Sequence, residues 1–441
     1  MIRLLALSLL VGTAVSASPQ NPTYHKDVLP VIQKNCQGCH RPGEAAPMSF
    51  LDYKATRPWA KAIKSAVVRT KMPPWQADPS ASHKFSNDLS LTDDERSVLV
   101  KWADQGAPEG NAKDAPKPLA FVEGWNISKP DIEYVMPQAF TVPATGTIEY
   151  QYIVVPTNLT EDKWVQMAEV RPGARPVVHH VIVYIRPKGS KWLAEAQPGV
   201  PFVPQRAKNR TASDSNGAVD PQENAGLMLQ SELLVGFAPG MPAQILEPGV
   251  AKLLPAGADL VMQMHYTSTG KEMTDQTRIG VVFAKAPPVR RDITLAAANN
   301  RFAIPAGDAN YEVRSQMTLP GNVTLINLMP HMHLRGKAFS YKLVYPNGET
   351  SQLLTIPKYD FNWQLVYTFA KPLELPAGSR IECVAHFDNS PNNPYNPDPR
   401  ATVRFGDQTW DEMMIGWFDI TVPAGADLRS LFWAKRTAGA D

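Results

Sequence analysis

Hydrophobic and polar residues follow two different patterns along the chain. In the first hundred residues apolar positions recur at helical spacing, which predicts helices over residues 25–32 and 61–69 and a third helix from Leu91. Beyond residue 125, short β-rich runs alternate with Pro, Gly and Asn turns, which predicts antiparallel sandwiches. The runs that predict strands include residues 148–155, 177–185, 260–267, 324–328 and 341–344.

A change of composition separates the two regions. Residues 106–119 are rich in Pro, Ala and Gly and lack apolar periodicity, which is typical of a linker. The roughly 315 residues that follow are too many for one sandwich. The predicted organisation is therefore a helical domain, a linker and two all-β antiparallel, jelly-roll-like sandwiches, at residues 20–107, 108–124, 125–290 and 291–441.

Composition narrows the class of protein. Lys and Arg number 44 against 42 Asp and Glu, so the chain lacks the basic excess that nucleic-acid binding requires. Hydrophobic residues make up 44% and charged residues 20%, which excludes disorder as the main state. We expect a globular protein that does not bind nucleic acid.

The N-terminus predicts export. Arg3 precedes an apolar run over residues 4–15, and Val15-Ser16-Ala17 resembles a cleavage site, so residues 1–17 are predicted to be a signal peptide. The alternative is a membrane anchor, but the run is too short to cross a hydrocarbon core of about 30 Å. We therefore expect a periplasmic or secreted protein without a stable membrane span.

Two of the three cysteines lie in the sequence Cys36-Gln37-Gly38-Cys39-His40. This C-x-x-C-H pattern predicts covalent haem attachment, because two thiols can add to the two vinyl groups of one haem while the histidine binds the iron. A redox dithiol and half of a zinc site are the alternatives. The first lacks a βαβ context, and the second lacks another Cys/His pair at suitable spacing.

The first hundred residues resemble a small c-type cytochrome, which implies an all-α cytochrome c domain with one covalently bound haem c. The sequence Lys71-Met72-Pro73-Pro74-Trp75 is similar to the usual axial Met-Pro turn, so Met72 is predicted as the sixth iron ligand. Met48 and His83 are the alternatives. His25 is expected to be a surface or helix-start residue.

Five of the nine histidines fall in three strand-like segments. His331 and His333 are two residues apart, so on a strand they share a face and can bind one metal ion. His179 and His180 would face opposite sides of a regular strand, so joint binding by them requires a bulge. His265 lies in the third segment, two residues after Gln263. Any one of these histidines could be a core residue, but their concentration in apolar strands favours a metal site.

The residue types limit the metal. Five imidazoles without an obvious carboxylate partner suit copper or zinc, and a methionine ligand would favour copper. Residues 406–414 end in Asp411-Glu412-Met413-Met414, and Met413 taken alone could be a core residue.

The order His-His, Gln-x-His, His-x-His, Asp-Glu-Met is similar to the copper type II monooxygenases, the family of peptidylglycine α-hydroxylating monooxygenase and dopamine β-monooxygenase. The resemblance covers about residues 125–435. It implies two copper ions, one in each of two sandwiches. The two copper sites would face each other across solvent without forming a coupled pair. One ion, the electron donor, would be bound by His179, His180 and His265. The other, where oxygen reacts, would be bound by the catalytic residues His331, His333 and Met413, with Met414 as the alternative to Met413.

The resemblance implies hydroxylation of an activated C–H bond of a small organic substrate with O2. Electrons would come from an external ascorbate-like reductant or redox protein, through the haem on the same chain. Met329 stands where peptidylglycine enzymes carry an arginine for a substrate carboxylate, and Trp417 follows Met413 by four residues, which favours an apolar pocket. Gln263 is a candidate for orienting an imidazole. Cys383 is expected to be an inert buried thiol and His386 a structural residue.

Two other functions remain open from the sequence. One is a non-catalytic haem and copper electron-transfer or copper-carrying protein. The other is a metal-dependent hydrolase that uses His331 and His333, which is less favoured because no carboxylate base lies beside the pair.

Overall fold

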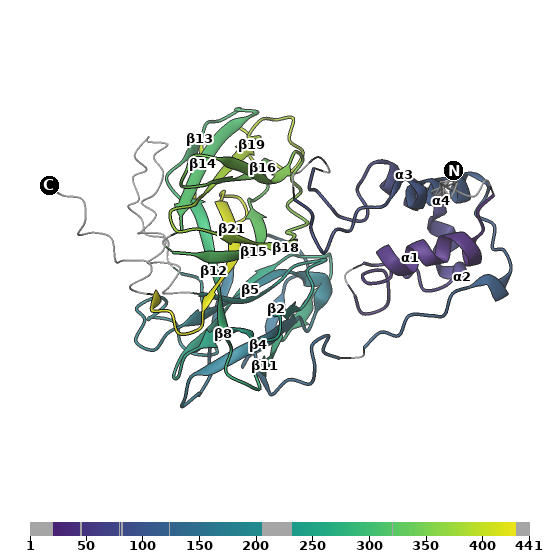
Figure 1. The fold of residues 1–441 in the computed structure, drawn as a ribbon. Helices are drawn as coiled ribbons and strands as arrows, with labels where there is room; N and C mark the ends of the chain where they lie inside the picture. The colour runs from purple at the N-terminus through teal and green to yellow at the C-terminus, as the bar shows by residue number, and fades with distance from the viewer. Residues whose placement is uncertain are drawn as a thin grey trace, which may run out of the picture. The chain divides into compact units, whose positions relative to one another are not determined.

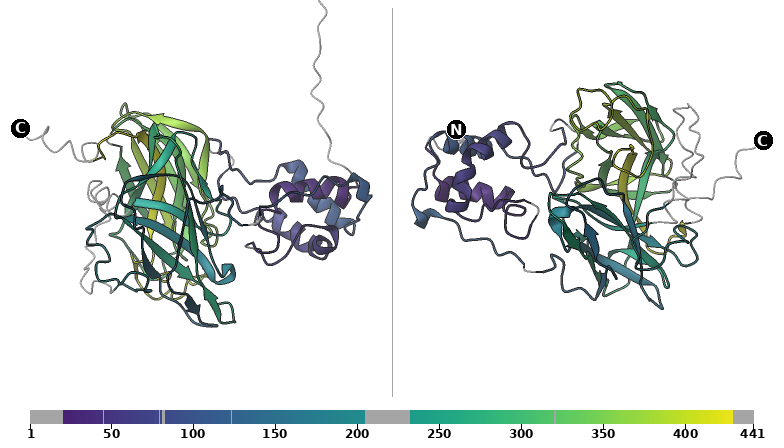
Figure 2. Two further views of the ribbon diagram at one scale, coloured as in Figure 1. Left: turned by 90° about the horizontal axis from the view of Figure 1, so that it is seen from below. Right: turned by 180° about the vertical axis from the view of Figure 1, so that it is seen from behind.

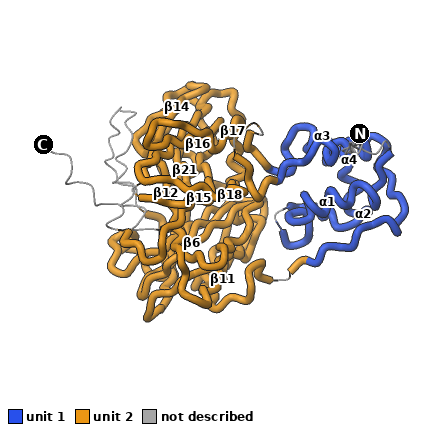
Figure 3. The backbone as a smooth tube through the Cα atoms, viewed as in Figure 1, with its two compact units in different colours: residues 1–74, 89–120 blue, residues 75–88, 121–441 orange. Residues whose placement is uncertain are grey.

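The structure, a computed structural model, describes residues 21–44, 46–78, 80, 83–122, 124–204, 232–319 and 321–428. The predicted signal peptide lies outside the described residues. The chain divides into two compact units: residues 1–74 with 89–120, and residues 75–88 with 121–441 (Figure 3). None of the described helices is long and apolar enough to cross a membrane.

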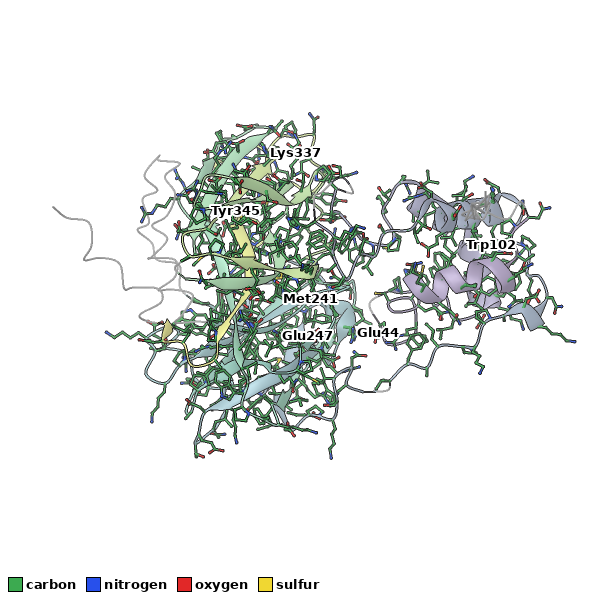
Figure 4. The ribbon with its side chains drawn as sticks, viewed as in Figure 1. Glu44, Trp102, Met241, Glu247, Lys337 and Tyr345 are labelled. Carbon is green, nitrogen blue, oxygen red and sulfur yellow. The ribbon has the colours of Figure 1, made fainter. Side chains whose placement is uncertain are left out.

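The first unit contains short helices around one apolar core. Thr92 and Glu95 form the expected capping box at the start of α4, because each side chain accepts the backbone N–H of the other residue. Trp102 of α4, labelled in Figure 4, lies among these helices. Its side chain is fully buried and packs with Tyr24 and Leu99. The helices of this unit are η1 (Tyr24–Val28), α1 (Leu29–Asn35), α2 (Tyr53–Thr56), η2 (Arg57–Trp59), α3 (Ala60–Val68), α4 (Asp93–Asp104) and η3 (Ala112–Asp114).

The predicted fold class, a small all-α cytochrome c domain followed by two all-β sandwiches, is wrong. The structure is mostly β-sheet, with 37% strand and 13% helix, and an N-terminal helical cytochrome domain is not evident. The longest described helix, α4, has only 12 residues. Helical spacing over a few turns predicted these individual helices. It did not suffice for the cytochrome c domain predicted at residues 20–107, because much of residues 36–52 is turn and bend and residues 75–88 belong to the β unit.

The second unit is built from strands (Figures 1 and 2). They are β1 (Ile132–Val135), β2 (Phe140–Val142), β3 (Gln151–Pro156), β4 (Lys163–Arg171), β5 (Val178–Arg186), β6 (Glu232–Phe237), β7 (Gln244–Ile245), β8 (Val250–Leu254), β9 (Asp259–Tyr266), β10 (Met273–Asp275), β11 (Arg278–Phe283), β12 (Arg290–Asn299), β13 (Ala303–Ile304), β14 (Tyr311–Thr318), β15 (Val323–His331), β16 (Gly336–Val344), β17 (Thr350–Ile356), β18 (Tyr367–Leu375), β19 (Arg380–Phe387), β20 (Val403–Arg404) and β21 (Met414–Pro423), with a 3-10 turn, η4 (Arg175–Val177), before β5.

One nine-stranded sheet runs through this unit in the order β1-β11-β4-β8-β12-β21-β15-β18, with β7 paired to β4. Two four-stranded sheets accompany it, β3-β9-β5-β6 and β14-β19-β16-β17. The parallel pairing of β8 with β12 joins the two halves of the large sheet. The predicted domain boundary at residues 290–291 falls at the start of β12, and it stays a prediction.

Residues 75–88 form a segment, called the strap here, that packs on strands of the second unit. Its backbone bonds to β17 and β18: Asp78 N–H donates to Thr355 C=O at 2.8 Å, and Ser86 N–H donates to Thr368 C=O at 2.8 Å. The Phe85 ring lies 5.5 Å from the rings of both Tyr367 and Phe369. His83, an alternative haem ligand in the sequence, bonds to Ser351 Oγ at 3.1 Å instead.

Candidate metal centre

A bulge in β5 brings His179 and His180 to the same place. In the ladder with β9, Val178 pairs with Tyr266 and His180 pairs with His265. Between these two pairs β5 advances by two residues and β9 by only one. This irregularity is the one that joint metal binding by neighbouring histidines requires. The three rings converge although His180 and His265 are 85 residues apart.

The nitrogens of these three rings are spaced as ligands of one ion. His180 Nδ1 lies 3.2 Å from His179 Nδ1 and 3.3 Å from His265 Nδ1. Two nitrogens bound to one ion at about 2.0 Å with near-tetrahedral angles are roughly 3.3 Å apart. His180 and His265 are buried, and all three ligand atoms lie within 4.8 Å of one another.

Neighbouring side chains hold these imidazoles in place. Phe361 stacks on His179, with ring centroids 5.0 Å apart and planes at 16°. Thr409 Oγ1 lies 3.0 Å from His265 Nε2, within hydrogen-bond distance. The predicted orienting residue, Gln263, instead donates to the Tyr152 hydroxyl.

His331 and His333 form a second pair at the end of β15. Their rings lie 5.2 Å apart at 88°. His331 Nδ1 is 2.8 Å from Gln364 Oε1, and His333 Nδ1 is 3.2 Å from Asp411 C=O. Both partners are acceptors, so each ring carries its proton on Nδ1 and presents Nε2 as a lone-pair donor to an ion.

Glu412 binds the backbone that carries His333. Its carboxylate accepts the N–H of His333 at 2.9 Å and the N–H of Arg335 at 2.6 Å. Complete burial raises the pKa of Glu412 to about 8, against the opposing effect of these N–H groups. The buried Arg335 side chain donates to Asn389 Oδ1 and to Trp410 C=O. The loop after β15 is thereby connected to the segment that precedes Met413.

Met413 packs against residues of β21 whose register partners lie on β15 beside the histidine pair. His331 pairs with Ile415 and Met329 pairs with Trp417 across β15 and β21, and alternate residues of a strand share a face. Met413 lies directly before β21, outside the strand, so its position comes from packing and not from register. It packs in an apolar cluster with Met329, Ile415 and Trp417. Met414, the alternative, is fully buried in the core on the other side.

Burial keeps the five imidazoles neutral. It lowers the pKa of His179 to about 4, of His331 to about 4 and of His333 to about 3. It also lowers the pKa values of His180 and His265 well below the ordinary value, and the neighbouring imidazoles add to this effect. Neutral imidazole is the form that binds a metal.

The residues fit copper ions. His333 Nε2, the ring nitrogen not bonded to the Asp411 carbonyl, is buried without a hydrogen-bond partner among the described residues, although buried polar atoms are normally paired. A ligand set of imidazoles and one thioether, without a carboxylate, suits copper. The sequence did not predict the contacts of Phe361 with His179 and of Gln364 with His331, because both residues lie in the connection between β17 and β18, which contains no recognisable motif. Thr409 stands four residues before Met413 in the quoted segment, so the sequence contained a signal for it.

The candidate haem residues lie just after α1. Cys36 and Cys39 are not joined in a disulfide, and the N–H groups of Cys39 and His40 donate to Cys36 C=O at 3.1 and 2.9 Å, so one turn holds all three residues together. The His40 ring stacks on Phe50, with centroids 4.2 Å apart. Burial raises the pKa of Cys36 to about 12. The two thiols and the imidazole fit the C-x-x-C-H mode of attachment.

The candidates for the sixth haem ligand differ in packing. Met72 is half-buried and is not part of the core of the first unit, whereas Cys36 and Met48 both pack against that core. His25 is the second residue of η1, and its Nε2 lies 3.4 Å from Glu109 Oε1. Met72 stays a prediction.

No family model matches the chain, and no curated protein matches it. Solved structures similar to it include the VP2 subviral particle of infectious bursal disease virus, at 9% identity over 69% of this chain and 75% of that chain, with a TM-score of 0.19. Allantoicase matches at 9% identity over 57% and 81%, with a TM-score of 0.16. Spike protein P1 of bacteriophage PM2 matches at 10% identity over 68% and 99%, with a TM-score of 0.14. At such TM-scores none of these structures bears on function, which must be argued from the site.

Proposed function

We propose that the protein is an exported copper-dependent monooxygenase that hydroxylates an activated C–H bond of a small organic substrate with O2. The observation that carries the proposal is the convergence of three imidazoles, His179, His180 and His265. A second set lies beside them, in which His331 pairs with Ile415 and Met413 packs in the cluster of Ile415. The order of these residues in the chain resembles that of the copper type II monooxygenases.

The two sets of ligands would have different roles. His179, His180 and His265 would hold an ion that stores one electron, and three neutral nitrogens suit both oxidation states of copper. His331, His333 and Met413 would hold the ion where oxygen reacts, since a soft thioether favours Cu(I). Copper bound there would supply one-electron transfer and reaction with O2.

The protein side chains would orient the ligands and exclude water. Gln364 and the Asp411 carbonyl hold the His331 and His333 rings through Nδ1. Met329 and Trp417 extend an apolar surface from Met413, and such a surface suits an apolar substrate better than a peptide carboxylate.

One oxygen atom would enter the C–H bond and the other would leave as water, which requires two electrons and two protons from outside the substrate. A haem c attached through Cys36 and Cys39, with His40 on the iron, would pass on the electrons one at a time. An ascorbate-like reductant or a redox protein of the periplasm or the extracellular medium would supply them.

The direct test combines copper analysis with oxygen uptake under a reductant. We expect two coppers per chain and substrate-dependent uptake. Met413→Ile should abolish hydroxylation and lower the copper content by one ion without changing the haem content. Met414→Ile, the matched control on the core side, should keep both coppers.

Three results would contradict the proposal. They are activity retained in Met413→Ile, binding of zinc alone, and two coppers without substrate-dependent uptake. The last would favour an electron-transfer or copper-carrying protein. Separately, haem reoxidation that is equally fast after removal of copper would show that the haem does not feed this site.

A further inference from the structure

The two imidazole sets are in contact with each other. The rings of His180, from the first set, and His331, from the second, lie 6.5 Å apart. Each ring is flanked by others of its own set, at 4.7 Å for His180 and His265 and at 5.2 Å for His331 and His333. The five histidines therefore form one continuous cluster.

Two aromatic rings touch both sets. Tyr150 lies 4.6 Å from His265 and 6.5 Å from His333, and Phe361 lies 5.0 Å from His179 and 6.0 Å from His333. The Tyr150 and Phe361 rings therefore occupy the space around the contact between the two sets. In an open cleft water would fill this space.

Burial agrees with this packing. His180 is 2% exposed, His331 6% and His333 0%. A solvent-filled gap between the sets would leave at least one ring of each set exposed at the gap. The resemblance to copper monooxygenases implied two sites that face each other across solvent, and this chain departs from that arrangement.

We infer that the two sets form a single dinuclear compartment, in which His180 and His331 bring the two ions close enough to couple magnetically. The inference rests on the proposed function, which supplies the two coppers. An electron would then pass between the ions within one buried cluster, without crossing water. Tyr150 and Phe361 are positioning residues in this arrangement, because they close the cluster from two sides.

Electron paramagnetic resonance of the full-length, copper-loaded protein tests the inference. Metal analysis gives the copper content, the X-ray absorption edge verifies that the copper is Cu(II), and the zinc-loaded protein gives the haem background. If the two ions are as close as in two-metal sites, the number of spins from the integrated copper signal should be at least about twofold lower than the number of bound copper ions. The spectrum should also contain a half-field transition. His331→Ala should bind one copper and give one full spin, because the partner ion is gone.

The outcomes separate the two proposals. Two coppers that give two full, additive signals would overturn the dinuclear inference and leave the proposed monooxygenase standing. A coupled pair without substrate hydroxylation would support the inference and overturn the monooxygenase. Fewer than two bound ions per chain would overturn both.

Discussion

Glu412 accepts the backbone N–H of His333 at 2.9 Å, although the two residues are 79 positions apart. The same carboxylate accepts the N–H of Arg335, so both of its oxygens are used. Met413 follows Glu412 directly. The hydrogen bond therefore connects the histidine and the methionine that are predicted to share one ion.

Replacing Glu412 with Gln should destabilise the protein and the second metal site together. A glutamine amide has one acceptor oxygen, so its NH2 group would face the N–H of His333 or Arg335. A buried donor left without a partner costs about 1–3 kcal/mol. Urea unfolding of the metal-free protein measures the loss, and copper analysis should show weaker binding of one ion. Glu349→Gln, at an exposed site, should stay within about 0.5 kcal/mol of the natural protein.

Lys252 holds three strands of the large sheet together at a buried point. Its ammonium lies 2.9 Å from Asp292 and 3.9 Å from Asp419, and Lys252 and Asp292 are each 1% exposed. Lys252→Met should lower the free energy of unfolding by about 3–5 kcal/mol, because it leaves a buried carboxylate without its cation. Lys252→Met with Asp292→Leu should recover much of the loss. A small effect of Lys252→Met alone, similar to that of Lys163→Met at a surface ion pair, would contradict this role.

Asp292 should also give the stability a pH dependence. Burial raises its pKa to about 7, against the opposing attraction of Lys252. The folded state therefore binds more protons than the unfolded chain between the ordinary carboxyl range and pH 7, and the stabilising contribution of this group is lost as the pH rises through 7. The difference in unfolding free energy between the natural protein and Asp292→Asn should fall from pH 4 to 7 and then level off. Urea titrations at several pH values test this, and a difference that grows with pH would contradict it.

Thr409 should tune the affinity of the three-histidine site. Its hydroxyl lies 3.0 Å from His265 Nε2, and hydrogen bonds to metal-binding imidazoles typically contribute about 10–100-fold in affinity. Thr409→Val keeps the shape and removes the hydroxyl, so copper binding at this site should weaken within that range. Thr409→Ser keeps the hydroxyl and should bind nearly as tightly. Equal affinities of the two variants in a competition titration would exclude this role.

The strap should detach when its main aromatic contact is removed. Phe85 packs on Tyr367 and Phe369, and the Trp75 ring lies 6.0 Å away. Phe85→Ala should increase proteolytic cleavage within residues 75–88, as followed by mass spectrometry. Lys84→Ala, whose side chain is exposed, should leave the cleavage rate unchanged. Equal protection of both variants would show that backbone bonds alone hold the strap.

The sequence by itself determined the features that depend on short spacing. The capping box at Thr92 and Glu95 forms because its two residues are one helical turn apart. His331 and His333 were predicted to lie together from their spacing of two, because strand residues alternate; their rings are 5.2 Å apart, although β15 ends at His331 and His333 lies beyond the strand. The same rule required a bulge at His179 and His180, and the ladder of β5 with β9 contains one.

Only the tertiary structure decided which distant segments meet. The pairing of His180 with His265 depends on strand register, and the contact of His180 with His331 depends on how two different sheets pack, neither of which local spacing specifies. The fold class was wrong for the same reason. Helical spacing predicted the individual short helices, but it could not show that residues 75–88 leave this unit and pack their aromatic side chains on strands of the β unit.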